Sequence, residues 1–192
     1  TYGPTDDTGR NYWEPLFVGK GYATVKGGTF LGDVEYFAYY GDGVGALTIA
    51  GGKFSVLPIG MTPNAGASIL VSGSDGFLTA YPTYADFAAA NSSAFSYDEA
   101  ENVLRMVGTY SVSNPGAWIN HDVTLDLGGN AFELKSSALI VNNKGVTLNI
   151  QDSGIGGMIK SQFNTAIDTL GTLNLISGKL ESVSSSAVLM HE

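Results

Sequence analysis

The stretch Val123-Thr124-Leu125-Asp126-Leu127 is followed at once by two glycines, and variants of this phrase recur along the chain. The other copies are Ala23-Thr24-Val25, Leu47-Thr48-Ile49, Val146-Thr147-Leu148-Asn149-Ile150 and Thr172-Leu173-Asn174-Leu175. The threonines stand 24 residues apart in the first half, and 23 and 25 apart in the second. A period of this size is typical of one coil of a solenoid. Apolar residues alternate within each phrase, which predicts strands with one buried face.

Two further apolar runs follow each phrase in the second half, separated by turns rich in glycine, serine and asparagine. These runs cover residues 131–134 and 138–141, then 158–160 and 166–168, then 179–181 and 187–190. Coils stacked about 4.8 Å apart would bury a continuous Val, Leu and Ile interior. We therefore predict an all-β fold, a parallel β-helix (β-solenoid) with three strands per coil. An antiparallel sandwich is the alternative, but it does not explain a strand order that recurs at a constant period.

This prediction divides the chain into three regions. Residues 1–60 are expected to form an N-terminal loop and the closing coils of a β-solenoid, and residues 117–192 the opening coils of a second stack. Between them, residues 61–116 break the repeat. Runs at 68–71 and 77–80 predict a hairpin, and helix-start patterns at Thr83 and Ser96 predict one or two short helices. We expect this region to be a cap or linker that covers the open end of a stack.

Composition excludes several classes of function. The chain has 192 residues, 44% of them hydrophobic, which is enough for a core. Its net charge of −9 disfavours nucleic acid and anionic membranes as partners. The absence of cysteine excludes disulfides, thiolate nucleophiles and cysteine-based metal sites. We find neither a long apolar run that would insert into a membrane nor a signal peptide in residues 1–20, so we expect a mature chain or a segment of a longer one.

The repeated phrases resemble those of a known fold type. The sequence at 123–129 is similar to phrases that open β-helix segments in long bacterial cell-surface proteins, and 27–30 and 51–54 resemble the Gly-Gly-Thr-Phe phrases that close them. The wider type is the right-handed parallel β-helix of pectate-lyase-like folds. The resemblance covers about residues 22–58 and 117–190. It implies an extracellular, cell-surface location and specifies architecture rather than activity.

The order of these phrases is inverted, because closing phrases stand in the first half and an opening phrase in the second. This order predicts that the chain contains the end of one β-helix joined to the start of another. Two chains placed head to tail would complete a coil, and such a heterologous contact propagates into a filament. The candidate self-assembly ends are Tyr22, Ala23, Val25 and Phe30 at one side and Ala187, Val188, Leu189 and Met190 at the other. The alternative is a repeat unit of a longer polypeptide, with covalent continuity at this junction.

Residues suited to catalysis are sparse. An enzyme on a β-helix needs grouped carboxylates and usually a basic residue. The expected outward column of Asp126, Asn149 and Asn174 has one carboxylate, and both arginines, Arg10 and Arg105, fall outside the expected coils. His121 precedes Asp122 in a turn, but no nucleophile motif accompanies them. We predict no catalytic residues, no cofactor and no metal site, leaving open only weak surface calcium; a polysaccharide lyase or hydrolase is the less favoured alternative.

Exposed aromatic residues offer a binding alternative. Tyr12, Trp13 and Phe17 in the N-terminal loop are expected either to pack at a junction between coils or to bind glycans, as in an adhesin. An outward column of Thr24, Thr48, Thr124, Thr147 and Thr172 would suit ice binding, but a second matching threonine rank is missing. The favoured expectation is a non-enzymatic structural module of a bacterial surface fibre, whose partner is another copy of itself.

Overall fold

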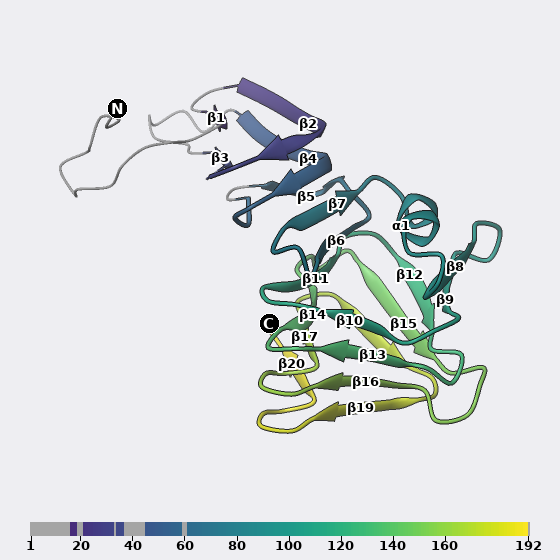
Figure 1. Ribbon diagram of the computed structural model, residues 1–192. Coiled ribbons are helices and arrows are strands. Elements are labelled where there is room, and N and C mark those ends of the chain that lie inside the picture. The colour runs from purple at the N-terminus through teal and green to yellow at the C-terminus, as the bar shows by residue number, and fades with distance from the viewer. Residues whose placement is uncertain (1–15, 19–20, 33, 37–44, 59–60, 192) are drawn as a thin grey trace.

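The computed structural model describes residues 16–18, 21–32, 34–36, 45–58 and 61–191. Within these ranges the chain is an all-β solenoid of parallel, stacked coils with one short helix, as the sequence predicts (Figure 1). Two stacks follow one another along the chain. They are joined by a hairpin in the middle, whose strands lie between β4 (Gly45–Phe54) of the first stack and β11 (Gly116–Ile119) of the second.

The first stack contains two long strands that pair in parallel. Its elements are β1 (Leu16–Val18), β2 (Gly21–Phe30), β3 (Val34–Tyr36), β4 (Gly45–Phe54) and β5 (Met61–Gly66). Thr24 pairs with Thr48, which confirms the 24-residue repeat. β2 and β4 do not stop at the glycines of the closing phrases. They continue through them with register shifts to Phe30 and Phe54, whose rings stack 5.2 Å apart.

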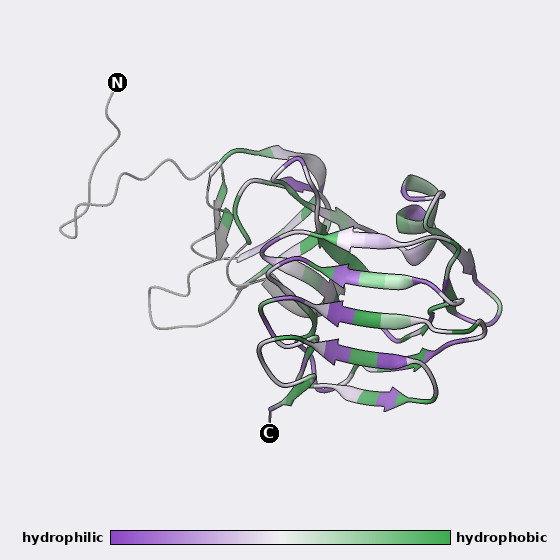
Figure 2. Ribbon diagram, turned by 60° about the horizontal axis from the view of Figure 1, so that its bottom comes forward, coloured by the Kyte–Doolittle hydropathy of each residue, from purple (hydrophilic) through white to green (hydrophobic). Residues whose placement is uncertain are grey.

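The second stack has three strands per coil and three sheets. Its strands are β8 (Phe95–Asp98), β9 (Val103–Met106), β10 (Tyr110–Val112), β11 (Gly116–Ile119), β12 (Val123–Asp126), β13 (Ala131–Leu134), β14 (Ala138–Val141), β15 (Thr147–Gln151), β16 (Met158–Ser161), β17 (Ile167–Thr169), β18 (Thr172–Leu175), β19 (Lys179–Ser182) and β20 (Val188–Met190). The parallel ladders run β9-β12-β15-β18, β10-β13-β16-β19 and β11-β14-β17-β20. Hydrophobic and hydrophilic residues alternate along these strands (Figure 2). The buried apolar residues of the three sheets form one hydrophobic core.

One register in the second stack differs from the sequence interpretation. Thr124 pairs with Asn149, and Asn149 with Asn174, so these three residues form the outward column. Thr147 pairs with Thr172 but not with Thr124. The expected column of five threonines is therefore wrong, because the phrase at 123–127 stacks on the phrase at 146–150 with a shift of two residues. Asn174 donates to Asn149 at 2.8 Å, and Asn149 to Thr124 at 3.3 Å, which ties the three coils together.

The middle region contains the predicted hairpin, β6 (Ile69–Ser72) and β7 (Leu78–Tyr81), and helix α1 (Tyr84–Ala90). Thr83 and Asp86 form a capping box at the start of α1, as the sequence predicts. The second helix-start pattern, at Ser96, is wrong. That segment forms the antiparallel pair β8–β9, in which Phe95 and Leu104 are buried.

The second stack begins earlier than residue 117. β9 pairs in parallel with β12, and β10 with β13, so both strands belong to its first coil rather than to a linker. The repeat is hidden in the sequence there because neither strand carries the repeated phrase. Helix α1 packs on this first coil, where Phe87 lies 4.8 Å from Phe95 and Phe95 lies 4.9 Å from Tyr110. One end of the second stack is thus covered by aromatic side chains.

A single sheet runs through both stacks, in the order β2-β4-β7-β6-β11-β14-β17-β20. The two hydrophobic cores lie on opposite faces of this sheet. On β6, Ile69 and Val71 belong to the core of the second stack, whereas Leu70 belongs to the core of the first. On β11, Ala117 and Trp118 divide in the same way. The hairpin therefore serves as a wall shared by two interiors.

The pairing directions determine how the stacks wind. The pairs β4–β7, β7–β6 and β6–β11 are antiparallel, so the strands of the second stack in the shared sheet run opposite to those of the first. The cores also lie on opposite faces. Reversing both the strand direction and the side of the core leaves the sense of winding unchanged. Both stacks thus wind in the same hand.

Candidate functional site

The last coil, β18, β19 and β20, presents an uncovered face. Its inward positions repeat those of the coil before. Leu148 is completely buried, but its partner Leu173 is only partly buried. Ile150 is completely buried too, but its partner Leu175 is 48% exposed. Ile167 is fully buried, and its partner Val188 is only half-buried. Each of these strands is paired on one side only within the described residues. This coil lies at the lower end of the second stack in Figure 1. Its inward apolar side chains are uncovered, and they are bordered by strand edges that are unpaired among the described residues.

The predicted C-terminal assembly residues all lie on this coil. Val188 and Met190 point inward, as shown by their partners Ile167 and Thr169, and Met190 is 67% exposed. Leu189 lies on the outer face. Ala187 precedes β20, and its carbonyl accepts the amide of Ile167. The sequence interpretation missed Leu175, which lies on the same open face because it pairs with the buried Ile150.

The other candidate end is the edge of β2. Tyr22 is 78% exposed and Val25 is buried, while Ala23 and Phe30 are intermediate. β2 pairs with β4 alone, so its second edge is free in the described part of the chain. Of the predicted aromatic residues, Tyr12 and Trp13 lie outside the described residues, and Phe17 is in β1, paired with Glu35. The glycan-binding role proposed for them is left untested.

Asp126 is the one fully buried carboxylate among the described residues. Contrary to the sequence interpretation, it does not stand in an exposed column with Asn149, and Arg105 does lie in a coil, on β9. The Arg105 Nε donates to Asp126 at 3.0 Å, and the amides of Gly128 and Ser153 donate to the same carboxylate at 3.1 and 2.9 Å. Burial opposes its ionisation, but these hydrogen bonds outweigh burial and hold the pKa of Asp126 below its usual value. The group holds together the turns of two coils.

Asp152 repeats this arrangement one coil further on. Its carboxylate accepts the amides of Gly129, Gly154 and Gly157 at 2.7, 3.1 and 2.7 Å. Since all three donors are backbone amides of adjacent turns, the carboxylate satisfies groups that tight turns leave unpaired. The acidic residues of these turns are thus explained by stacking.

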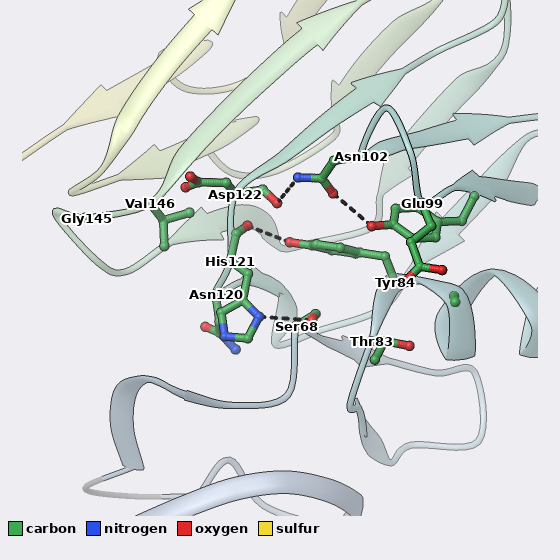
Figure 3. A pocket seen from close by; sticks show the side chains of 12 residues that line it. Ser68, Thr83, Tyr84, Glu99, Asn102, Asn120, His121, Asp122, Gly145 and Val146 are labelled. Carbon is green, nitrogen blue, oxygen red and sulfur yellow. Dashed lines mark hydrogen bonds between the residues drawn. The ribbon is translucent and has the colours of Figure 1, made fainter.

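A polar pocket of about 570 Å³ lies where the hairpin, α1 and the second stack meet (Figure 3). Its lining residues come from five segments: Ser68, Thr83, Tyr84, Ala85, Tyr97, Glu99, Asn102, Asn120, His121, Asp122, Gly145 and Val146. Tyr84 donates to the carbonyl of His121 at 2.7 Å, and Tyr97 to Asn102 at 2.9 Å. Burial raises the pKa of Tyr84 well above its usual value, so its hydroxyl remains a donor.

The pocket brings a serine and a histidine together. Ser68 Oγ lies 3.1 Å from His121 Nδ1, but it also donates to the carbonyl of Pro82 at 2.9 Å. Because a hydroxyl has one proton, the histidine nitrogen must be the donor to Ser68. A general base would have to accept that proton instead. Asp122 does not orient the ring, since its carboxylate accepts the amide of Thr147 at 2.7 Å. The Ser68–His121 pair is arranged to hold the hairpin against the coil.

Comparisons with known proteins give no relative: no family model, no curated protein and no solved structure matches the chain. In the described ranges, no helix is long and apolar enough to span a membrane. The same residues contain no cluster of three histidine, aspartate or glutamate side chains that could hold a metal ion.

Proposed function

We propose that this protein is a non-enzymatic structural module, a β-solenoid unit that builds a fibre by coil-on-coil pairing with further copies of itself. The observation that carries the proposal is the open last coil. Side chains equivalent to completely buried residues of the coil before are partly or largely exposed there, and among the described strands β18, β19 and β20 are each unpaired on one edge. Unpaired edges next to apolar surface favour strand addition.

The contrast between the two ends of the second stack supports this proposal. The first coil is closed by α1 and by the aromatic cluster of Phe87, Phe95 and Tyr110. The last coil has no comparable cover within the described residues: Leu175, Ile176 and Met190 are exposed. An apolar coil face without a cap favours contact with a partner. Among the described strands β2 has a second unpaired edge, which is what a propagating contact requires.

The resemblance of the repeated phrases to those of bacterial cell-surface proteins supports a location at the cell surface. Fibres and stalks on a cell surface need length and stiffness, which stacked coils give because each coil contacts only its neighbours. We propose an extracellular, cell-surface location on that basis.

Sedimentation velocity tests the proposal. The full chain of 192 residues should show a sedimentation coefficient that rises with concentration, and Met190→Lys should abolish the rise because it places a charge in the open interior. Ile155→Lys is the matched control: Ile155 is 97% exposed on the turn between β15 and β16, so the same charge change there should leave assembly intact. A wild-type protein that sediments as a monomer at all concentrations contradicts the proposal.

The polar pocket favours glycan binding as a second candidate function. Its wall combines the tilted aromatic pair Tyr84–Tyr97, whose rings lie 5.9 Å apart, with Glu99 and Asn120. Sugars bind to such mixtures of aromatic faces and carboxylate or amide groups. A glycan array would show binding that Tyr97→Ala removes. Binding that is unaffected by Tyr97→Ala would exclude this pocket.

A further inference from the structure

The geometry points to a specific relation between neighbouring copies: we propose that the second copy docks on β20 through its own β2, turned by about half a turn around the stack axis relative to the first. This inference rests on the proposed self-assembly and deepens it by naming the pairing surfaces. β2 and β20 are the two edges of the same sheet, so a copy that continues the sheet brings β20 of one chain beside β2 of the next.

A simple translation along the stack cannot complete a coil. The antiparallel pairs β4–β7, β7–β6 and β6–β11 make β2 run opposite to β20. A translated copy would therefore set its β2 antiparallel to β20. Its core would also lie on the wrong side: Phe30 on β2 stacks on Phe54, which faces the first core, whereas Val188 and Met190 face the second. The open interior of β20 would remain uncovered.

A half turn around the stack axis corrects both mismatches at once. It reverses the direction of β2 so that β2 and β20 become parallel, as all pairs within the stacks' ladders are. It also moves the core side of β2 to the face where Val188 and Met190 point. Because the two stacks wind in the same hand, the joined coils then continue one solenoid. The filament would have a screw axis of about two subunits per turn, and it would not close on itself.

The absence of cysteine makes this relation testable by selective disulfide formation. Thr29 lies on the outer face of β2, because it pairs with Lys53 while its neighbour Phe30 faces inward. Leu189 lies on the outer face of β20 and Met190 on its inner face. After a half turn, Thr29 and Leu189 share one face. After a translation, Thr29 shares a face with Met190. Same-face residues that lie directly opposite each other on paired strands are within disulfide range, and residues on opposite faces are out of range.

The experiment mixes singly substituted full-length chains. Thr29→Cys protein is activated as a pyridyl disulfide and added to Leu189→Cys or to Met190→Cys protein, so that only mixed pairs can form. Rapid coupling to Leu189→Cys, at least tenfold faster than to Met190→Cys, is expected. Faster coupling to Met190→Cys overturns the half turn while leaving self-assembly standing. If the Leu189→Cys and Met190→Cys proteins both couple no faster than they do in denaturant, and the wild-type protein is monomeric, self-assembly itself is overturned. Helical reconstruction of wild-type fibres gives the independent check, because zero rotation between subunits contradicts the inference.

Discussion

At the scale of single residues, buried polar groups and glycines hold the turns of the solenoid in place. Asp126 is fully buried, and each of its partners belongs to a different segment: Arg105 on the coil before, Gly128 in the next turn, and Ser153 in the coil after. A buried charge is stable only when its hydrogen bonds are all satisfied. This carboxylate therefore couples three coils.

Asp126→Asn should lower the free energy of unfolding by about 2 kcal/mol at neutral pH, because an amide nitrogen would face the Arg105 donor. The folded-state pKa of Asp126 lies below its usual value of 3.8. Its contribution to stability is therefore present above that pH and is lost as the pH falls through the folded-state pKa. Urea unfolding at pH 7 and pH 3 should show the difference between variant and wild type shrinking in acid. Asp168→Asn is the control, since Asp168 is partly exposed with His191 as its partner, and it should change stability by less than about 1 kcal/mol. An equal effect of both substitutions at both pH values would contradict this role.

Gly171 makes a corner where no side chain fits. A Cβ there would meet the carbonyl oxygen of Asn143 at 2.7 Å and a methyl group of Val141 at 2.8 Å. We expect Gly171→Ala to cost about 2 kcal/mol or more, from overpacking against backbone that cannot move. Gly27→Ala should be close to neutral, because no atom lies within 4 Å of its Cβ position. Thermal unfolding of both variants compares them, and equal melting temperatures would argue against the close approach at residue 171.

At the scale of elements, the hairpin β6–β7 is the part on which both stacks depend. Neighbouring residues on β6 belong to different interiors: Leu70 to the core of the first stack and Val71 to that of the second. Leu70→Ala and Val71→Ala are therefore each other's controls. We expect Leu70→Ala to cost about 3 kcal/mol and to speed amide exchange mainly in β4, whereas Val71→Ala should speed exchange mainly in β11 and β14. Identical exchange profiles would show that the two cores do not open separately.

A comparison of the predicted with the observed strands shows how much of the fold the sequence could predict. The repeat predicted every strand from β12 to β20, because its apolar runs are separated by turns rich in glycine, serine and asparagine. The register could not be predicted: the spacing of the threonines predicted that Thr124 pairs with Thr147, but Thr124 pairs with Asn149, two residues further on. β9 and β10 were missed since they lack the phrase, and the helix-start pattern at Ser96 was overridden when Phe95 and Leu104 became buried in the coil.

The sequence also predicted some parts of the candidate sites and could not predict others. The last strand, β20, lies where the end of the repeat predicted a strand, and a role in assembly for its residues stays a prediction. The pocket of Tyr84, Tyr97 and His121 could not be predicted, because its wall joins segments from five parts of the chain. The burial of Asp126 depends on the coil that contributes Arg105, and that coil carried no sequence signal.

At the scale of the whole molecule, charge and apolar surface act against each other. The net charge of −9 makes copies repel, while the open interior of the last coil favours their contact. Raising the ionic strength from about 0.01 to 0.15 M shortens the Debye length from about 30 to 8 Å. Assembly should therefore strengthen with salt, with a lower concentration threshold in light scattering. A threshold that rises with salt would indicate that ion pairs, rather than apolar coils, join the copies.

Electron microscopy of negatively stained wild-type protein, at rising concentration and without ligand, tests self-assembly most directly. The account predicts unbranched fibres one solenoid wide, in which fibre length grows with concentration and Met190→Lys leaves only single particles. Dispersed single particles of the wild-type chain at every concentration would contradict it, because the open coil would then have no affinity for the edge of β2.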